Sequence, residues 1–414
     1  MSWSYWSDLG WCYHAEGKQA AALKAYTRAE ELLTDQGPQA EAGGGGAEGV
    51  DGSASRERQA MEVELTARVR VKTQVGTIQR QIGQVDEAVQ SFTDALQLDP
   101  KSGLALEGAG EAYLAQAHAR TSEGLYTAAV TALRLGSDVT RRFLAADGSG
   151  RGGGRGGRGV ESKACALKLL GDLHTYGHKL PPMSFEGEGA RERGGVRQRG
   201  SPEAAEADLD LAKQGAKNRL EFVGRGAAAY QRLVQLLGAS AGADGSQVQS
   251  ASEAVEMSPA SALYDLGLNY LLRARLLCAD SGEGSGLWAQ DVHEQLPGVE
   301  DLARPAEQAF KQSIEAEPSH SDAWNGLGVV SRDPLVRQHC FVRAVQLEHN
   351  PSAWANLGML YLRWGLDGQA YGSFGGLQAV TDHPTMWVGL GLLKEKEACG
   401  PDVAAAKRRR LLSQ

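Results

Sequence analysis

The stretch "SDAWNGLGVV" (321–330) carries Trp324, Leu327 and Gly328, and "PSAWANLGMLY" (351–361) repeats these three residue types in the same register. Offsets of three and four residues return to one side of an α-helix, so the three side chains share a helical face. A bulky residue and a glycine on one face are typical of a helix that lies close to a second helix. The stretch therefore predicts a closely packed helical structure.

The same phrase occurs eight times along the chain, and its glycine is present every time. The first position is Trp or Leu in seven of the eight copies. The copies are Trp6-Leu9-Gly10-Tyr13, Lys72-Val75-Gly76-Gln79, Leu106-Ala109-Gly110-Tyr113, Leu167-Leu170-Gly171-His174, Leu263-Leu266-Gly267-Tyr270, Trp324-Leu327-Gly328-Ser331, Trp354-Leu357-Gly358-Tyr361 and Trp387-Leu390-Gly391-Lys394.

A second phrase accompanies several copies of the first. It places an aromatic residue four positions after an alanine and then ends in a small residue or a proline. The clearest copies are Ala22-Tyr26-Ala29, Ala88-Phe92-Ala95 with Pro100, Ala306-Phe310 with Pro318, and Ala370-Phe374. The two phrases together match the tetratricopeptide repeat, a helix pair with a period of about 34 residues.

The residue types follow from the packing of such a pair. Glycine and alanine leave room where two helix backbones approach, and the aromatic and leucine side chains fill the space between them. Proline lacks an amide hydrogen and ends the second helix. A single pair cannot bury its apolar face, so pairs must stack. We predict an all-α fold, a tetratricopeptide-repeat α-solenoid in which antiparallel helix pairs form a right-handed superhelix.

Eight repeats follow from the pattern, with low-complexity segments between some of them. We place repeat 1 at 1–34, a low-complexity loop at 35–57, repeat 2 at 58–100, repeat 3 at 101–145, an Arg/Gly-rich linker at 146–162, a degenerate repeat 4 at 163–238 with an inserted loop at 177–204, a linker at 239–258, repeat 5 at 259–319 with an inserted loop, repeat 6 at 320–350, repeat 7 at 351–382, and a partial repeat 8 with a basic tail at 383–414. The segments rich in glycine, serine or charge are too polar to offset their ordering entropy, and we expect disordered insertions.

Two basic stretches have a second interpretation. "RGGGRGGRG" (151–159) is a composition that can engage single-stranded RNA, but its three arginines come without an aromatic residue for stacking, which favours a spacer. "KRRR" (407–410) is compatible with a nuclear signal. It lies where repeat 8 loses its pattern, so an irregular chain end is the alternative.

Composition excludes several classes of protein. The chain has 414 residues and a net charge of −8, from 43 basic and 51 acidic residues that are well mixed, so it is not a polycation built for nucleic acid. No apolar run reaches the roughly 18 residues of a membrane span, and the N-terminus lacks a secretion signal. Five scattered cysteines without a CxxC pair argue against a disulfide framework and a zinc site. We expect a cytoplasmic protein, with a nuclear pool possible.

No motif of catalysis is present. The sequence has no GxxxxGK[ST], GxSxG or HExxH, so we predict no enzyme activity, no catalytic or metal-binding residue and no cofactor. His174 takes the tyrosine position of its repeat, which favours packing over metal binding. The candidate residues are instead the repeat signature: Trp6, Gly10, Tyr13, Gly76, Phe92, Pro100, Gly110, Tyr113, Gly171, Gly267, Tyr270, Phe310, Trp324, Gly328, Trp354, Gly358, Tyr361, Trp387 and Gly391.

Some repeat arrays of this type bind peptides through an asparagine just before the Leu-Gly pair, or through a basic clamp on three consecutive repeats. In this sequence the asparagine position, directly before the Leu-Gly pair, holds Asp8, Gln74, Gly108, Leu169, Asp265, Gly326, Asn356 and Gly389. Only Asn356 matches. An asparagine ladder and a carboxylate clamp are both disfavoured.

Four longer phrases carry a more specific resemblance. They are "CALKLLGDLHT" (165–175), "SALYDLGLNYLLRA" (261–274), "SDAWNGLGVV" with "RQHCFVRAVQLE" (337–348), and "AWANLGMLYLRWGLDGQAYGSF" (353–374). In this order they resemble the tetratricopeptide scaffold subunit of the superkiller (Ski) complex, clearly over about 160–380. Members of that family are longer, and repeat 6 here is short, with 30 residues from Trp324 to Trp354, which indicates a partial or diverged chain.

The resemblance implies a non-catalytic scaffold that holds a DExH-type RNA helicase and WD-repeat subunits. The assembled complex of that family feeds mRNA into the cytoplasmic exosome for decay from the 3′ end. It implies protein partners, indirect contact with RNA at most, and no membrane or small-molecule substrate. Two alternatives remain at this point: a generic adaptor of chaperones or other complexes, and an RNA-binding protein acting through the Arg-Gly segment.

Overall fold

The structure, a computed structural model, describes residues 2–35, 50–100, 102–146, 158–185, 202–241, 258–280, 298–381 and 384–399. Over these residues the chain forms fifteen α-helices and two short 3₁₀ helices, with no β-strand. The predicted all-α fold is therefore confirmed. The helices group into two compact parts, 1–173 and 174–414, and each is described by itself.

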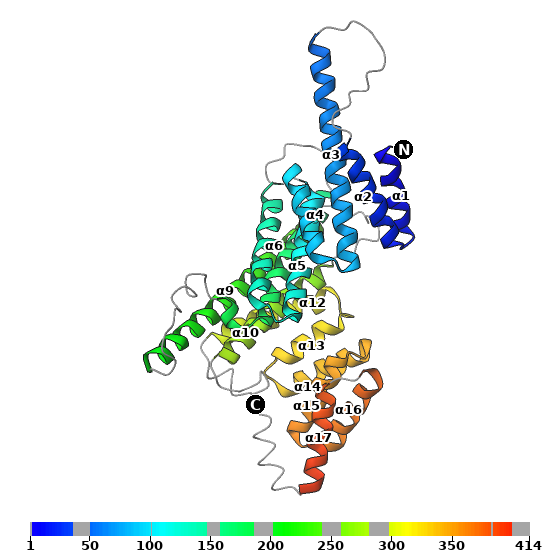
Figure 1. Cartoon of the computed structure of the whole chain (residues 1–414). Coiled ribbons are helices and arrows are strands. Elements are labelled where there is room, and N and C mark those ends of the chain that lie inside the picture. The colour runs from blue at the N-terminus through cyan, green and yellow to red at the C-terminus, as the bar shows by residue number, and fades with distance from the viewer. Residues whose placement is uncertain are drawn as a thin grey trace. The chain divides into compact units, whose positions relative to one another are not determined.

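The N-terminal part contains three antiparallel helix pairs and most of one further helix (Figure 1). Its helices are α1 (Trp3–Ala15), α2 (Gln19–Asp35), α3 (Val50–Ile82), α4 (Val85–Leu98), α5 (Gly103–Ser122), α6 (Tyr126–Ala146) and α7 (Arg158–Tyr176). Tyr26 of α2 and Phe92 of α4 are completely or almost completely buried. Each ring fills the space between the two helices of its pair, as the repeat pattern predicts.

A glycine closes the turn inside several pairs. Gly83 has a φ of +91°, in the left-handed region that side chains disfavour. Its N–H donates to the Arg80 carbonyl at 3.1 Å, and the next N–H, of Gln84, donates to the Gln79 carbonyl at 2.8 Å. This geometry ends the first helix and reverses the chain. Positive φ angles recur at Gly17, Gly124 and Gly365.

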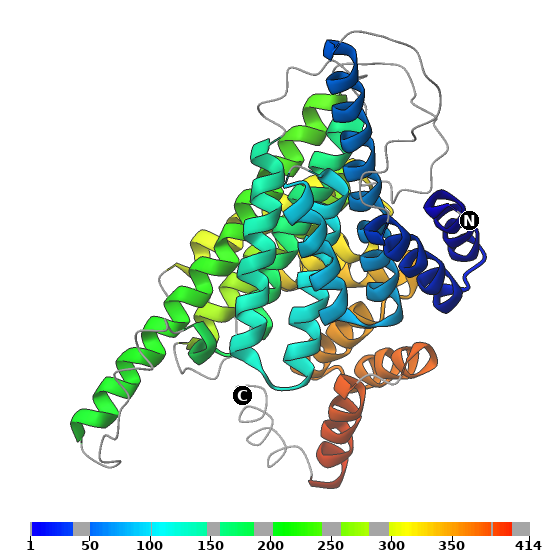
Figure 2. The ribbon, with the colours of Figure 1, turned by 45° about the horizontal axis from the view of Figure 1, so that its top comes forward.

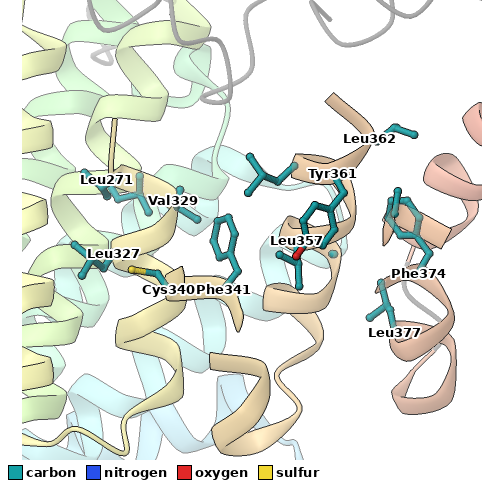
Figure 3. Close-up of a cluster of buried hydrophobic side chains, with 14 of the residues drawn as sticks. Leu271, Leu327, Val329, Cys340, Phe341, Leu357, Tyr361, Leu362, Phe374 and Leu377 are labelled. Carbon is teal, nitrogen blue, oxygen red and sulfur yellow. The ribbon is translucent and has the colours of Figure 1, made fainter. Parts of the chain in front are cut away.

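The C-terminal part begins with an irregular segment and continues as stacked helices. Its elements are η2 (Gly177–Lys179), η3 (Pro182–Phe185), α9 (Pro202–Ala241), α10 (Pro259–Asp280), α12 (Val299–Ala316), α13 (Ser321–Val330), α14 (Pro334–Glu348), α15 (Pro351–Trp364), α16 (Asp367–Val380) and α17 (Pro384–Cys399). One hydrophobic core extends from α10 to α17, with Phe310, Phe341 and Phe374 completely buried. Figure 3 shows part of this core, to which α13, α14, α15 and α16 each contribute side chains.

The short sixth repeat has a local cause. Helix α13 has only 10 residues, and α14 begins after a three-residue connection that has no glycine turn. Asp333 caps α14 by accepting the Leu335 N–H at 2.8 Å, and Pro334 takes the first helical position. The capping aspartate and the proline therefore start the second helix early.

Helices occupy parts of the segments that we predict to be disordered. Helix α3 begins at Val50, inside the predicted loop 35–57, and α7 begins at Arg158, inside the linker 146–162. Helix α9 covers the end of the inserted loop 177–204 and the start of the linker 239–258, and it extends beyond the other helices of its part (Figure 2). A polar composition does not prevent a helix from continuing outward from a packed end. The rest of these segments, most of "RGGGRGGRG" and the stretch "KRRR" lie outside the described residues.

Candidate partner-binding surfaces

The signature residues divide by burial into three groups. Buried are Gly10, Gly76, Phe92, Gly110, Gly171, Gly267, Phe310, Gly328, Gly358 and Tyr361. Half-buried are Trp6, Tyr13, Tyr113, Tyr270, Trp324 and Trp354, and exposed are Pro100, Trp387 and Gly391. Most of the signature therefore lies inside the helix stack, and a partner can reach only its edges.

Each signature glycine with a clear second phrase lies against the aromatic ring of its own pair. A Cβ on Gly10 would lie 2.9 Å from the Tyr26 ring, and one on Gly358 would lie 2.5 Å from the Phe374 ring. The corresponding distances are 3.0 Å for Gly76 to Phe92, 2.8 Å for Gly267 to Phe310 and 2.5 Å for Gly328 to Phe341. These distances are shorter than ordinary carbon contacts, so the position has room only for glycine.

A second glycine contact was not predicted from the sequence. Gly326, two residues before the signature glycine, would place a Cβ 2.6 Å from the Phe310 ring of the preceding repeat. Gly108 meets Phe92 and Gly389 meets Phe374 in the same way. One ring therefore separates two first helices, its own and the next. At these repeats the position of the asparagine ladder is occupied by a packing contact.

Two half-buried tryptophans bind neighbouring elements. The indole N–H of Trp324 donates to the carbonyl of Pro318, the proline that ends the preceding repeat, at 2.9 Å. Trp354 lies against Gly376 of α16, where a Cβ would be 2.9 Å from its ring.

Lys72 replaces the aromatic residue in repeat 2, and its ammonium group lies 2.6 Å from Glu30 and 3.3 Å from Asp94. An ion-pair bridge between α2, α3 and α4 takes the place of aromatic packing there.

Three signature positions differ from this scheme. Gly110 would meet Leu169 and Thr140 rather than an aromatic ring of its own pair, because repeat 3 has Leu133 at that place. In α17 no described atom lies within 4 Å of a Cβ on Gly391, and Trp387 is 57% exposed. Both residues are exposed, and the described residues include no second helix after α17.

His174 lies in the core, as its repeat position predicts. It is buried, and its ring centre is 4.5 Å from that of Phe222 in α9. The described residues contain no group of three or more possible metal ligands, at His174 or elsewhere. Within the same residues, no helix is both long and apolar enough to cross a membrane.

Polar residues join the first helices of repeats 6 and 7. The side-chain amide of Asn356 donates to the Asn325 carbonyl oxygen at 2.8 Å, and that of Asn350 donates to Asp322 at 2.6 Å. Asn356 is the residue that matches the ladder position. Because the same position holds Gly326 in the preceding repeat and Gly389 in the next, Asn356 does not begin a ladder that extends into the neighbouring repeats.

The irregular segment "GHKLPPMSF" (177–185) breaks the helical pattern and exposes the side chains of Lys179 and Met183. It replaces the regular turn of repeat 4, yet Leu180 and Phe185 are almost completely buried. Arg219 of α9 donates to the Leu180 carbonyl at 3.1 Å, and Asn218 donates to the Phe185 carbonyl at 3.1 Å. These bonds hold the segment against α9. In this arrangement the side chains of Lys179 and Met183 remain exposed to solvent.

Two exposed cations lie at this segment. The Lys179 ammonium group lies 5.1 Å from the centre of the Tyr176 ring, and Arg275 of α10 is exposed nearby. Burial lowers the pKa of His178, although the hydrogen bond between its ring and the Thr175 carbonyl raises it in part. The positive charges of Lys179, Arg275 and Arg219 lower this pKa further. The side chains whose charges act on His178 are all cations, and two of them, Lys179 and Arg275, are exposed.

Comparison with known proteins agrees with the repeat geometry. The tetratricopeptide repeat family matches residues 69–102, which cover the second half of α3 and all of α4. This match identifies residues 69–102 as a tetratricopeptide repeat, and the stacked helix pairs over the described residues are a fold of the same class. Proteins of this class bind protein partners, which fits the exposed edges of the stack.

Two relatives are similar in sequence. Tetratricopeptide repeat protein 37 of Xenopus laevis is 23% identical over 397 residues, which cover 94% of this chain and 20% of the relative. Superkiller protein 3 of Saccharomyces cerevisiae is 34% identical over 93 residues, which cover 22% of this chain and 6% of the relative. The chain thus spans about a fifth of the length of the Xenopus relative. Among solved structures, a tetratricopeptide repeat protein from Parabacteroides merdae is 12% identical with a TM-score of 0.40, covering 95% of this chain and 97% of that chain.

Proposed function

We propose that this chain is a non-catalytic scaffold of a superkiller-type complex, which supports exosome-mediated mRNA decay from the 3′ end in the cytoplasm. The observation that carries the proposal is the similarity to the Xenopus relative over 94% of the chain, together with the 34% identity to Superkiller protein 3. The partners would be a DExH-type RNA helicase and WD-repeat proteins.

The geometry supports a scaffold for a physical reason. The signature residues are used for packing between helices, and what remains exposed is a series of edges and turns at regular intervals. Such a surface offers many separate contact points to other proteins. Large partners can be held by several weak contacts at once, which fits a scaffold better than a catalyst.

Affinity purification tests the proposal. The full chain, tagged and expressed in its native organism, should recover a DExH-type helicase and WD-repeat proteins at constant ratio. Recovery of Hsp70 or Hsp90 without them would support a chaperone adaptor instead. Recovery of RNA that depends on residues 151–159, without either protein class, would support the RNA-binding alternative.

A matched pair of variants tests whether the partner proteins bind the folded repeats specifically or adhere non-specifically to exposed helices. Gly328→Val disturbs the helix contact at Phe341, whereas Gly372→Ala changes an exposed position of α16 with no described atom within 4 Å of the new Cβ. Partner recovery should fall for the first variant and stay unchanged for the second. Equal recovery with both would argue against binding by the folded repeats.

A further inference from the structure

The segment 177–185 is held with more interactions than a connection between two helices requires. Besides the bonds from Arg219 and Asn218, the Phe185 ring lies 5.5 Å from the Phe222 ring, and a Cβ on Gly177 would lie 2.8 Å from that same ring. Asn269 of α10 adds a bond to the Thr175 hydroxyl at 2.8 Å, one residue before Tyr176. Surface segments fixed in this way are typical of recognition sites.

The fixed segment presents positive charge that no described carboxylate neutralises. Among the described residues, neither Lys179 nor Arg275 forms an ion pair. Glu221, on the helix that carries Arg219, is already paired with Arg225 at 2.9 Å. Cations grouped without carboxylates attract an acidic partner and repel a basic one.

We propose that the segment Gly177–Phe185 and Arg275 form a docking surface for an acidic peptide segment of a partner protein. Lys179 and Arg275 contact its carboxylates, and the side chain of Met183, which is 69% exposed, covers an apolar residue beside them. The inference rests on the proposed scaffold function only in taking the ligand to be a protein.

The surface fits a peptide better than single-stranded RNA. Sites for single-stranded RNA combine positive charge with exposed aromatic rings on which bases stack. Here Tyr176 is only 9% exposed and Phe185 is buried, so no aromatic ring of the segment is free for stacking. The site also differs from a ladder along the first helices of successive repeats, because it belongs to an irregular turn and one side chain of α10.

Fluorescence anisotropy with the purified full chain tests this inference. The probe is a short labelled peptide of glutamate and aspartate with a central leucine. Controls are the same peptide with glutamine and asparagine in place of the acids, and a labelled oligouridine. The acidic peptide should bind, with an affinity that falls as salt rises, and the two control probes should bind at least about tenfold more weakly.

The variant pair consists of two charge reversals with equal net charge. Lys179→Glu with Arg275→Glu should weaken peptide binding by about tenfold or more. Arg232→Glu with Arg343→Glu changes two exposed cations, one towards the C-terminal end of α9 and one in α14, and should leave binding within about twofold, since neither lies beside Asn218 or Arg219. Far-UV circular dichroism checks that both double variants keep the wild-type helix content.

Several outcomes would overturn the inference: equal binding by both double variants, equal binding of the neutral peptide, or tighter binding of the RNA with the same dependence on Lys179 and Arg275. The result is independent of the affinity purification. If the helicase is recovered but the peptide fails, only this inference falls. If the peptide binds but no helicase or WD-repeat protein is recovered, only the superkiller assignment falls.

Discussion

At the scale of single residues, the protein depends on pairing a buried ring with a missing side chain. Phe310 touches Gly267 in its own repeat and Gly326 in the next, and Phe374 touches Gly358 and Gly389 in the same way. Dispersion contacts of a ring require close approach on both faces. The glycines are thus part of the packing, although they have no side chain of their own.

Gly328→Val should destabilise the C-terminal part by about 1–3 kcal/mol. The new Cβ would lie 2.5 Å from Cε1 of Phe341, a completely buried ring that cannot move without disturbing the core. Urea unfolding followed by far-UV circular dichroism measures the change. Gly372→Ala is the matched control, and it should stabilise the protein by up to about 1 kcal/mol, because alanine favours an exposed helix. Equal midpoints for Gly328→Val and the wild type would show that no close contact exists at this position.

The cysteines should differ in reactivity in the folded protein. Cys12 is exposed, whereas burial raises the pKa of the Cys340 thiol to about 11 and leaves almost no thiolate at neutral pH. Timed alkylation followed by peptide mass spectrometry should label Cys12 first and Cys340 only after unfolding. Labelling of both at one rate would contradict the buried position of Cys340.

At the scale of elements, the regular repeats and the degenerate one are held together differently. Regular pairs use a ring, glycines and a turn glycine, so apolar packing sets the distance between helices. Repeat 4 has no turn glycine among its described residues, and polar bonds from α9 and α10 fix its irregular segment together with the Phe222 ring. Asn269 is central to it: its amide donates to the Thr175 hydroxyl and to the Val223 carbonyl at 3.0 Å.

Asn269→Leu should cost about 1–3 kcal/mol, because it leaves buried acceptors without a donor. The loss should be local, so amide hydrogen exchange should become faster at Gly177–Leu180. Gln231→Leu is a suitable control, since it removes an exposed bond to the Tyr270 hydroxyl and should change stability little. Unchanged exchange at Gly177–Leu180 in the Asn269 variant would show that the amide bonds do not hold the segment.

At the scale of the whole molecule, each helix pair packs mainly against its neighbours in sequence. Stability in such a stack is a sum of local terms, and damage spreads only a short way. A single unfolding free energy therefore describes the chain poorly, and measurements resolved by position are more informative.

Gly76→Val should speed hydrogen exchange in α3, α4 and α5 and leave α13 to α17 unchanged. The converse variant, Gly358→Val, should speed exchange in α15 and α16 and leave α1 to α4 unchanged. Both substitutions place a side chain against a buried ring, Phe92 in one case and Phe374 in the other. Faster exchange over the entire chain with either variant would show one cooperative unit rather than a stack of local ones.

The sequence by itself determined that this protein is an all-helical stack. The offsets from Trp324 to Leu327 and Gly328 are local, so they define one helical face wherever they occur, and their repetition along the chain predicts the pairs. The turn at Gly83 could have been predicted, since a glycine also occupies the turn at Gly17 and at Gly365. The spacing within the helices does not by itself specify a glycine at the turn.

Only the tertiary structure decided which residues meet across elements. The contact between Gly326 and Phe310 joins two repeats, Arg219 reaches a carbonyl 39 positions away, and Gly391 meets no described side chain. Such contacts depend on how helices that are distant in sequence lie against each other, and no periodicity within one helix encodes that. The helices could therefore be predicted from local spacing, whereas the exposed cations at the segment 177–185 became visible only from its contacts with α9 and α10.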